Sequence, residues 1–162
     1  MQFHKYASPK IFYALAGQLI PWFAVATLIL LGYGLYQGLF VAPPDYQQGE
    51  SVRIMFIHVP AAWMSMFVYM VMASAGAIGL IWNMRLADMA ATASAPIGAS
   101  FTLLALVTGS LWGKPMWGTW WAWDARLTSE LLLFFLYLGF MALQAAIDEP
   151  RRAARAGALL AL

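Results

Sequence analysis

The sequence has no cysteine, little charge and only two histidines, and each scarcity removes a class of function. Without cysteine there can be no disulfide, no thiolate metal site and no covalent cofactor attachment through a C-x-x-C-H motif. Charged side chains make up 10% of the 162 residues, and the net charge of +2 is small and scattered along the chain. This charge pattern argues against nucleic acid as a partner.

Patterns for catalysis are missing as well. A zinc site usually needs three or four His, Cys or carboxylate ligands at one point, and the sequence offers no such cluster. No nucleophile and base pair, glycine-rich phosphate loop or paired carboxylates are visible. The sequence therefore predicts a protein that is not an enzyme of bond chemistry.

Apolar residues are in excess: 63% of the chain is hydrophobic, against about half in soluble domains. Three long runs, residues 11–44, 54–84 and 89–113, carry no Asp, Glu, Lys or Arg. Because a helix crosses the hydrocarbon with roughly 20 residues, these runs predict membrane-spanning helices. We expect an all-α, polytopic membrane protein that forms one integral membrane domain over residues 1–162, with four complete transmembrane helices at about 19–40, 60–82, 92–111 and 128–147.

The expected ends of these helices follow from proline, polar residues and charge. A signal peptide is a poor interpretation of the first run, which is too long and has no small-residue cleavage site after it. We place Pro60 in the first turn of the second helix, His58 just before it, and Thr128 or Ser129 at the cap of the fourth helix. The last residues, after the charged run 148–155, predict the start of a further helix near residue 157 and a protein that continues beyond Leu162.

Lysine and arginine set the expected orientation, because they collect on the cytoplasmic side. With the N-terminus inside, six of these residues are cytoplasmic and three are outside: Lys5, Lys10, Arg85, Arg151, Arg152 and Arg155 against Arg53, Lys114 and Arg126. On this topology His58 and the segment that follows the third helix share the outer face. His4 lies about 30 Å away across the bilayer, so the two histidines cannot bind one iron.

That outer segment, residues 112–127, is rich in tryptophan. Five of the eight tryptophans fall within twelve residues: Trp112, Trp117, Trp120, Trp121 and Trp123. If residues 116–124 were helical, Trp117, Trp120, Trp121 and Asp124 would make one stripe, whereas Gly113, Pro115 and Gly118 favour an irregular start. Two interpretations remain open at this point, an interfacial tryptophan belt and a platform for a flat ligand.

His58 is the one candidate metal ligand on the outer face. It is either an interfacial imidazole that hydrogen-bonds a loop carbonyl or an axial ligand to a porphyrin. A porphyrin is a flat apolar disc that needs an axial ligand, an aromatic surface, and cations or N–H donors for its propionates. His58, the tryptophans, and the cations Arg53, Lys114 and Arg126 supply those three features.

Four stretches carry a resemblance to a known family. They are WGKPMWGTWWAWD at residues 112–124, FIHVPAAW at residues 56–63, DYQQG at residues 45–49 and DARLTSEL at residues 124–131. The first resembles the tryptophan-rich WWD signature of haem-handling membrane proteins in c-type cytochrome maturation. Together the four stretches are most similar to the haem exporter protein C family (CcmC).

The resemblance implies six helices and haem b held non-covalently on the periplasmic face of a bacterial inner membrane. His58 matches the first of two axial histidines, and the second is implied to lie beyond Leu162. Within this sequence only Met116 or water is left as the sixth ligand of the haem iron. The implied cofactor-binding residues are Trp112, Gly113, Trp117, Gly118, Trp120, Trp121, Trp123, Asp124, Arg126 and Arg53, with His58 on the iron.

The resemblance also implies partners: a periplasmic haem chaperone, subunits of an ATP-binding-cassette (ABC) transporter, a small single-helix membrane subunit and the lipid bilayer. An alternative is a b-type haem electron-transfer subunit, which would carry histidine within its spans, and none is seen there. A second alternative is a structural transporter subunit with an interfacial tryptophan belt. For Asp124 we expect a structural role, capping the next helix or pairing with Arg126.

Overall fold

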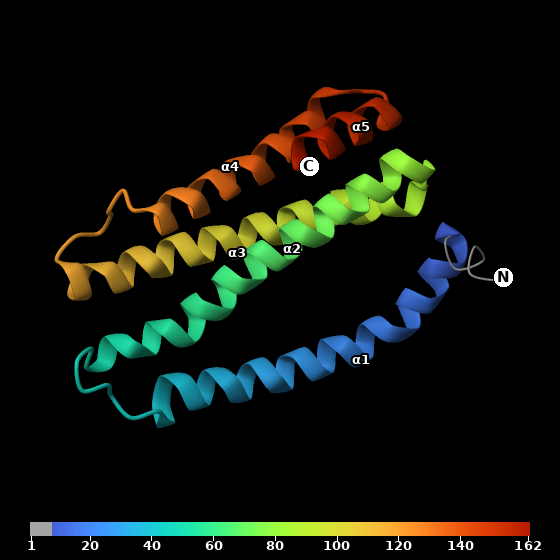
Figure 1. The fold of residues 1–162 in the computed structure, drawn as a ribbon. Helices are drawn as coiled ribbons and strands as arrows, with labels where there is room; N and C mark the ends of the chain where they lie inside the picture. The colour runs from blue at the N-terminus through green and yellow to red at the C-terminus, as the bar shows by residue number, and fades with distance from the viewer. Residues whose placement is uncertain (1–7) are drawn as a thin grey trace. The chain divides into compact units, whose positions relative to one another are not determined.

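The computed structural model describes residues 8–162, so His4 and Lys5 lie outside the described residues. The chain divides into two compact units, Met1–Pro43 and Pro44–Leu162, which are described separately (Figure 1). The single integral membrane domain expected from the sequence stays a prediction. The first unit contains α1, Pro9–Tyr36, which continues through a π-helical turn, Gln37–Val41. No residue of α1 is buried, and its large apolar side chains are exposed, as suits a helix surrounded by lipid or by other helices.

The second unit is a bundle of helices. A 3₁₀ helix, Glu50–Ile54, leads into α2, Met55–Trp82, and then come α3, Arg85–Trp117, α4, Ala125–Ala146, and α5, Pro150–Ala161. Within residues 8–162 there is no strand, and four helical stretches are long and apolar enough to cross a membrane. The predicted fold class, an all-α polytopic membrane protein, is confirmed.

α2 ends at Trp82, as the sequence predicts, but the helices begin at other residues than expected. α2 begins five residues before Pro60, α3 begins at Arg85 and not near residue 92, α4 begins at Ala125 and not at 128, and α5 begins at Pro150 and not near 157. The expected ends were placed where the apolar runs stop. A helix satisfies its backbone hydrogen bonds internally and so continues into polar residues until a cap ends it.

The ends of α2 and α3 show such caps. α2 ends at Asn83, which has a left-handed backbone with φ 52°, and α3 ends at Gly118 with φ 75°. The Gly118 N–H bonds the carbonyl of Lys114, 3.1 Å away. Glycine adopts positive φ without steric cost, so Gly118 is a natural end for α3.

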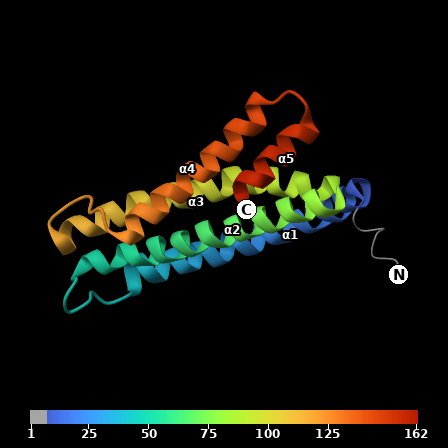
Figure 2. The ribbon, with the colours of Figure 1, turned by 45° about the horizontal axis from the view of Figure 1, so that its top comes forward.

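α2 and α3 lie side by side along most of their lengths, with α4 against α3 and α5 against α2 and α4 (Figures 1 and 2). The core between them is built largely from small residues on α2, α3 and α5 and two aromatic residues of α4: Met72, Ala75, Ala91, Ala95, Ala99, Ala161, Tyr137 and Phe140. Small side chains let membrane helices approach closely.

Tyr137 attaches α4 to both α2 and α3. Its ring occupies the space next to Gly98 of α3, where an added Cβ would lie 2.0 Å from the Tyr137 Cζ. Its buried hydroxyl donates a hydrogen bond to the carbonyl oxygen of Ser65 on α2, at 2.7 Å. This contact fixes where α4 runs, and therefore where the loop between α3 and α4 can lie.

Candidate functional site

His58 lies in the second turn of α2 and its ring faces α3. Its Nδ1 is 3.1 Å from the carbonyl oxygen of Ala105 and 3.1 Å from the hydroxyl oxygen of Thr108. A carbonyl only accepts hydrogen bonds, and the Thr108 hydroxyl donates its own hydrogen to the carbonyl of Leu104, at 2.6 Å. Both neighbours therefore require the proton on Nδ1. The lone pair of Nε2 is then available to a metal.

The position of His58 differs from the sequence prediction, which places it before the first turn of the helix. The helix begins three residues earlier because the chain passes directly from the 3₁₀ helix into α2. As a result the imidazole is half-buried against α3. Gly109 makes room for it, since a Cβ there would lie 3.1 Å from the His58 Cε1. Sequence reasoning missed Thr108 and Gly109.

Trp112 connects His58 to the loop that precedes the 3₁₀ helix. The two rings are stacked, with centroids 6.5 Å apart and planes 21° apart. The indole Nε1 of Trp112 donates a hydrogen bond to the Gln48 Oε1, at 3.0 Å. The loop is held by Asp45, whose carboxylate accepts from the backbone N–H groups of Gln47 and Gln48 at 2.9 and 2.8 Å. Gln48 belongs to the DYQQG motif, but sequence reasoning gave it no role.

Trp117, in the last turn of α3, extends this contact. Its ring meets Trp112 edge-on, with centroids 5.0 Å apart and planes 76° apart. Gly113 permits the arrangement, because a Cβ there would lie 3.2 Å from the Trp117 Cε3 and 3.3 Å from the Thr119 carbonyl oxygen. Edge-on packing of this kind is favourable for aromatic rings. His58, Trp112 and Trp117 thus form one continuous ring contact, which we call the His–Trp row.

The remaining tryptophans lie in the loop of residues 118–124, which is not helical. The expected stripe of Trp117, Trp120, Trp121 and Asp124 on one helical face is therefore wrong, because Gly118 ends α3 directly after Trp117. Trp120 and Trp123 are 55% and 77% exposed. Trp121 packs edge-on against Trp123 at 5.4 Å, and its buried indole N–H has no acceptor within residues 8–162.

The three cations expected at this end are all engaged. Lys114 donates to the carbonyl of Gly118 at 3.0 Å and lies 5.8 Å from the centre of the Trp120 ring. Arg126 pairs with Asp124 at 2.8 Å and lies 5.4 Å from the centre of the Trp117 ring. Arg53 pairs with Glu50. Lys114 and Arg126 therefore belong to the tryptophan surface itself.

Asp124 is the N-cap of α4. Its Oδ1 accepts a hydrogen bond from the backbone N–H of Leu127 at 2.8 Å, and its Oδ2 accepts from Arg126. The bond from Leu127 and then that from Arg126 hold the pKa of the Asp124 carboxyl below its usual value. The expected cap and ion pair of Asp124 are confirmed, whereas the predicted caps Thr128 and Ser129 are wrong. α4 begins one turn earlier because Asp124 satisfies its first free N–H groups.

This fold and site define a class: a polytopic helical membrane protein in which a half-buried histidine contacts a row of tryptophans that continues into an exposed tryptophan loop. Comparison with protein families matches residues 2–162 to the family described as "Heme exporter protein C". The chain belongs to this family.

Individual relatives carry the same name. The chain is similar to heme exporter protein C of Bradyrhizobium diazoefficiens, with 63% identity over 156 residues that cover 96% of this chain and 59% of the relative. It is 56% identical to that of Escherichia coli K12 over 159 residues, which cover 98% of this chain and 65% of the relative. It is 45% identical to heme exporter protein C of Paracoccus denitrificans over 162 residues, which cover 100% of this chain and 67% of the relative. The chain thus spans about three fifths to two thirds of the length of these relatives.

Proposed function

We propose that this chain binds haem non-covalently at the His–Trp row and presents it for c-type cytochrome biogenesis, as part of a haem export system. The observation that carries the proposal is the hydrogen bond of His58 Nδ1 to the Ala105 carbonyl. Histidine ligands to metals typically donate their second nitrogen in this way, which fixes the tautomer and the direction of the ligating lone pair. The relatives that are 45% to 63% identical are named heme exporters.

The residues at this end fit haem as a cargo. His58 Nε2 supplies an axial ligand, and the exposed rings of Trp120 and Trp123 supply apolar surface for the porphyrin. The indole N–H of Trp121, buried without an acceptor, is a donor that a propionate would satisfy. Trp112, Gly113, Trp117 and Gly118 shape the surface, while Asp124 and Arg126 hold the end of the loop. Arg53 remains a proposed propionate partner through its position near the start of α2.

The proposed location is a bacterial inner membrane, with the His–Trp row on the periplasmic face. Within the second unit, Arg85, Arg151, Arg152 and Arg155 lie at the end of the bundle away from His58, as positive residues do on the cytoplasmic side. The opposite end carries Lys114 and Arg126, whose charges are engaged by the loop. The orientation predicted from the sequence stays our proposal.

Presentation requires that haem can leave again. A porphyrin held by an axial bond and by aromatic contact has no covalent bond to break, so release needs no bond chemistry from this chain. We propose that a periplasmic haem chaperone receives it at the exposed face of Trp120 and Trp123. Subunits of an ABC transporter and a small single-helix subunit complete the proposed assembly.

The test is haem content after purification. Replacing His58 by alanine should abolish or severely reduce retained haem, measured by the Soret band and by extraction of the pigment, whereas His4→Ala should not. Because Ala could disturb packing against Gly109, the His58→Gln variant should be prepared too, and added imidazole should restore part of the haem band in His58→Ala. Equal haem content in the parent and both His58 variants would overturn the proposal. The tryptophans would then be an interfacial belt.

A further inference from the structure

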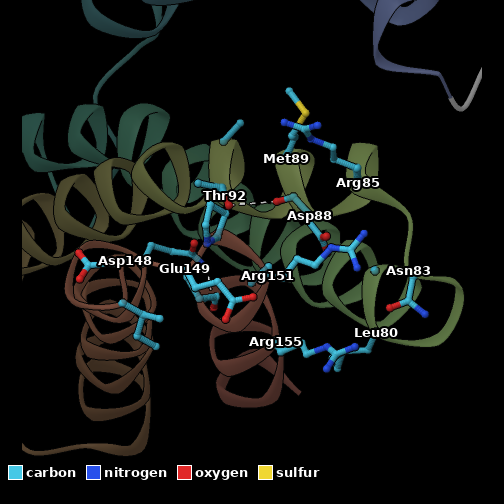
Figure 3. Close-up of a pocket in the computed structure, with 17 residues that line it drawn as sticks. Leu80, Asn83, Arg85, Asp88, Met89, Thr92, Asp148, Glu149, Arg151 and Arg155 are labelled. Carbon is cyan, nitrogen blue, oxygen red and sulfur yellow. Dashed lines mark hydrogen bonds between the residues drawn. The ribbon is translucent and has the colours of Figure 1, made fainter.

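A second site lies at the other end of the bundle. A cavity of about 800 Å³ opens between the ends of α2, α3, α4 and α5 (Figure 3). Its lining includes Gly79 and Leu80 near the end of α2, and His58 lies about six turns away along the same helix. The cavity therefore has no residue in common with the His–Trp row.

The lining carries both signs of charge in equal number. Three arginines, Arg85, Arg151 and Arg155, stand against three carboxylates, Asp88, Asp148 and Glu149. Within residues 8–162 none of these arginines is in an ion pair, whereas Glu149 pairs with Arg152, which does not line the cavity. In Figure 3 the side chains of Arg151 and Arg155 extend from α5 toward the ends of α2 and α3. A cavity with unpaired cations and carboxylates fits a ligand that carries both charges.

The depth of the cavity indicates where such a ligand comes from. Membrane-spanning segments end or begin around it: at Trp82, at Arg85 and at Ala146. This is the level at which lipid headgroups meet the protein. Leu80, Met89 and Ile147 add apolar surface next to the charged residues. Basic pockets between membrane helices at this level bind the phosphate groups of anionic lipids such as cardiolipin, so the arginines fit the phosphate of a lipid headgroup.

Two helices also begin at the cavity, which adds to its affinity for an anion. α3 begins at Arg85 and α5 at Pro150, and the side chains at their N-caps, Met84 and Glu149, make no capping hydrogen bond. Pro150 has no N–H, and the N–H groups of Ala87 and Ala153 already bond the carbonyls of Met84 and Glu149. The N–H groups left for a phosphate oxygen are those of residues 85–86 and 151–152. They complement the guanidinium groups of Arg151 and Arg155.

We propose that this cavity binds the headgroup of an aminophospholipid, phosphoethanolamine. Arg151 and Arg155 hold the phosphate, and Asp88 accepts hydrogen bonds from the ammonium group. Asp88 is placed for this role by Gly79, since a Cβ at that position would lie 2.1 Å from the Asp88 Oδ1. Asp88 and Asp148, which are in no ion pair within residues 8–162, favour this zwitterion over phosphatidylglycerol, whose headgroup offers no cation to a carboxylate.

The test uses the purified protein in nanodiscs of phosphatidylcholine with small amounts of either phosphatidylethanolamine or phosphatidylglycerol, and counts retained lipid by native mass spectrometry. We expect phosphatidylethanolamine to be retained preferentially. Arg151→Gln and Arg155→Gln should each lower its retention about fivefold to tenfold, the effect of one charge-assisted hydrogen bond. Lys10→Gln is the control, with the same loss of one positive charge at an exposed residue outside the lining, and should leave retention unchanged.

Asp88→Asn separates the two halves of the headgroup. It should remove the preference for phosphatidylethanolamine over phosphatidylcholine and leave phosphate-dependent retention in place. Soluble glycerophosphoethanolamine should not displace the lipid, because the site takes its ligand from the membrane surface. Equal loss in Arg151→Gln and Lys10→Gln, preferential retention of phosphatidylglycerol, or displacement by the soluble compound would each overturn the proposal.

Discussion

The Nδ1 of His58 and the carbonyl oxygen of Ala105 lie 3.1 Å apart, across the contact between α2 and α3. Thr108 adds its hydroxyl oxygen at the same distance from the same nitrogen. Two neighbours from one helix thus fix the ring of the other helix, so the direction of Nε2 depends on the packing of α2 against α3. The His–Trp row therefore lies on helices, and only the exposed tryptophans of residues 118–124 lie in a loop.

Thr108→Val tests this fixation. Valine has nearly the same shape but cannot accept the Nδ1 hydrogen bond, while the Ala105 carbonyl stays in place. Outer partners of metal ligands typically contribute 10- to 100-fold to affinity, so we expect haem binding to weaken about tenfold. Haem titration followed at the Soret band measures it. Thr102→Val is the control: Thr102 also bonds within α3, to the carbonyl of Gly98, without touching His58. A similar loss in both variants would show an effect of helix packing alone.

Gln48→Leu should disturb the His–Trp row from the side of the loop. It removes the acceptor of the Trp112 indole N–H and leaves a partly buried donor unpaired, at a cost of roughly 1 kcal/mol or more. We expect weaker haem binding and a shifted haem band, because Trp112 stacks on His58. Gln48→Glu keeps an acceptor and should retain most of the binding. Gln47→Leu changes a neighbouring exposed residue, and a loss there as large as in Gln48→Leu would contradict the assignment.

Trp123→Ala addresses the tryptophan surface, since this ring is 77% exposed at the loop. Stacking on tryptophan contributes on the order of 1 to 3 kcal/mol per ring, so haem binding should weaken about fivefold or more. The double variant Trp120→Ala and Trp121→Ala should lose more, with membrane insertion intact. Trp82→Ala is the control, because it removes another exposed tryptophan, 64%, at the end of α2 away from His58. If binding is as strong in Trp123→Ala as in Trp82→Ala, the loop tryptophans do not contact haem.

Asp124 should make the order of the tryptophan loop depend on pH. Its pKa is lowered in the folded protein by the Leu127 N–H and by Arg126, so its stabilising bonds are fully present above its unfolded pKa of about 4 and are lost as pH falls through the lowered value. Asparagine also caps a helix, but it does not titrate. The loop of Asp124→Asn should therefore keep its order in acid, whereas that of the parent loosens. Tryptophan fluorescence and haem content followed on acidification compare the two.

Asp124→Ala serves as the reference for this prediction, because it lacks the cap at every pH. It should show lower haem occupancy already at neutral pH, with the same iron ligand. If Asp124→Asn loses haem as completely as Asp124→Ala at neutral pH, the charge itself matters and the cap does not explain the role of Asp124.

The fold could be predicted because membrane spans have a simple signature: three long charge-free runs, and the apolar run of residues 131–147, predicted the four spanning helices. The end of α2 at Trp82 was predicted, but most other helix boundaries were not, since they depend on caps such as Gly118 and Asp124 and not on hydropathy. The His58 position and the tryptophan segment were recognisable from residue type. Thr108, Gly109 and Gln48 were not, because they act through contacts 50 to 64 residues apart that only the packing of the helices creates.

The length of α3 has a consequence for access. With 33 residues it is about 50 Å long, while the hydrocarbon of a bilayer is about 30 Å thick. A helix of this length, centred in the membrane, extends about 10 Å beyond the hydrocarbon at each end. Its last turns therefore hold Trp112 and Trp117 outside the hydrocarbon. If haem binds at these tryptophans, as we propose, a water-soluble domain can reach it without entering the lipid. A haem molecule that arrives from within the bilayer has to leave the hydrocarbon and move about 10 Å outward to reach this site.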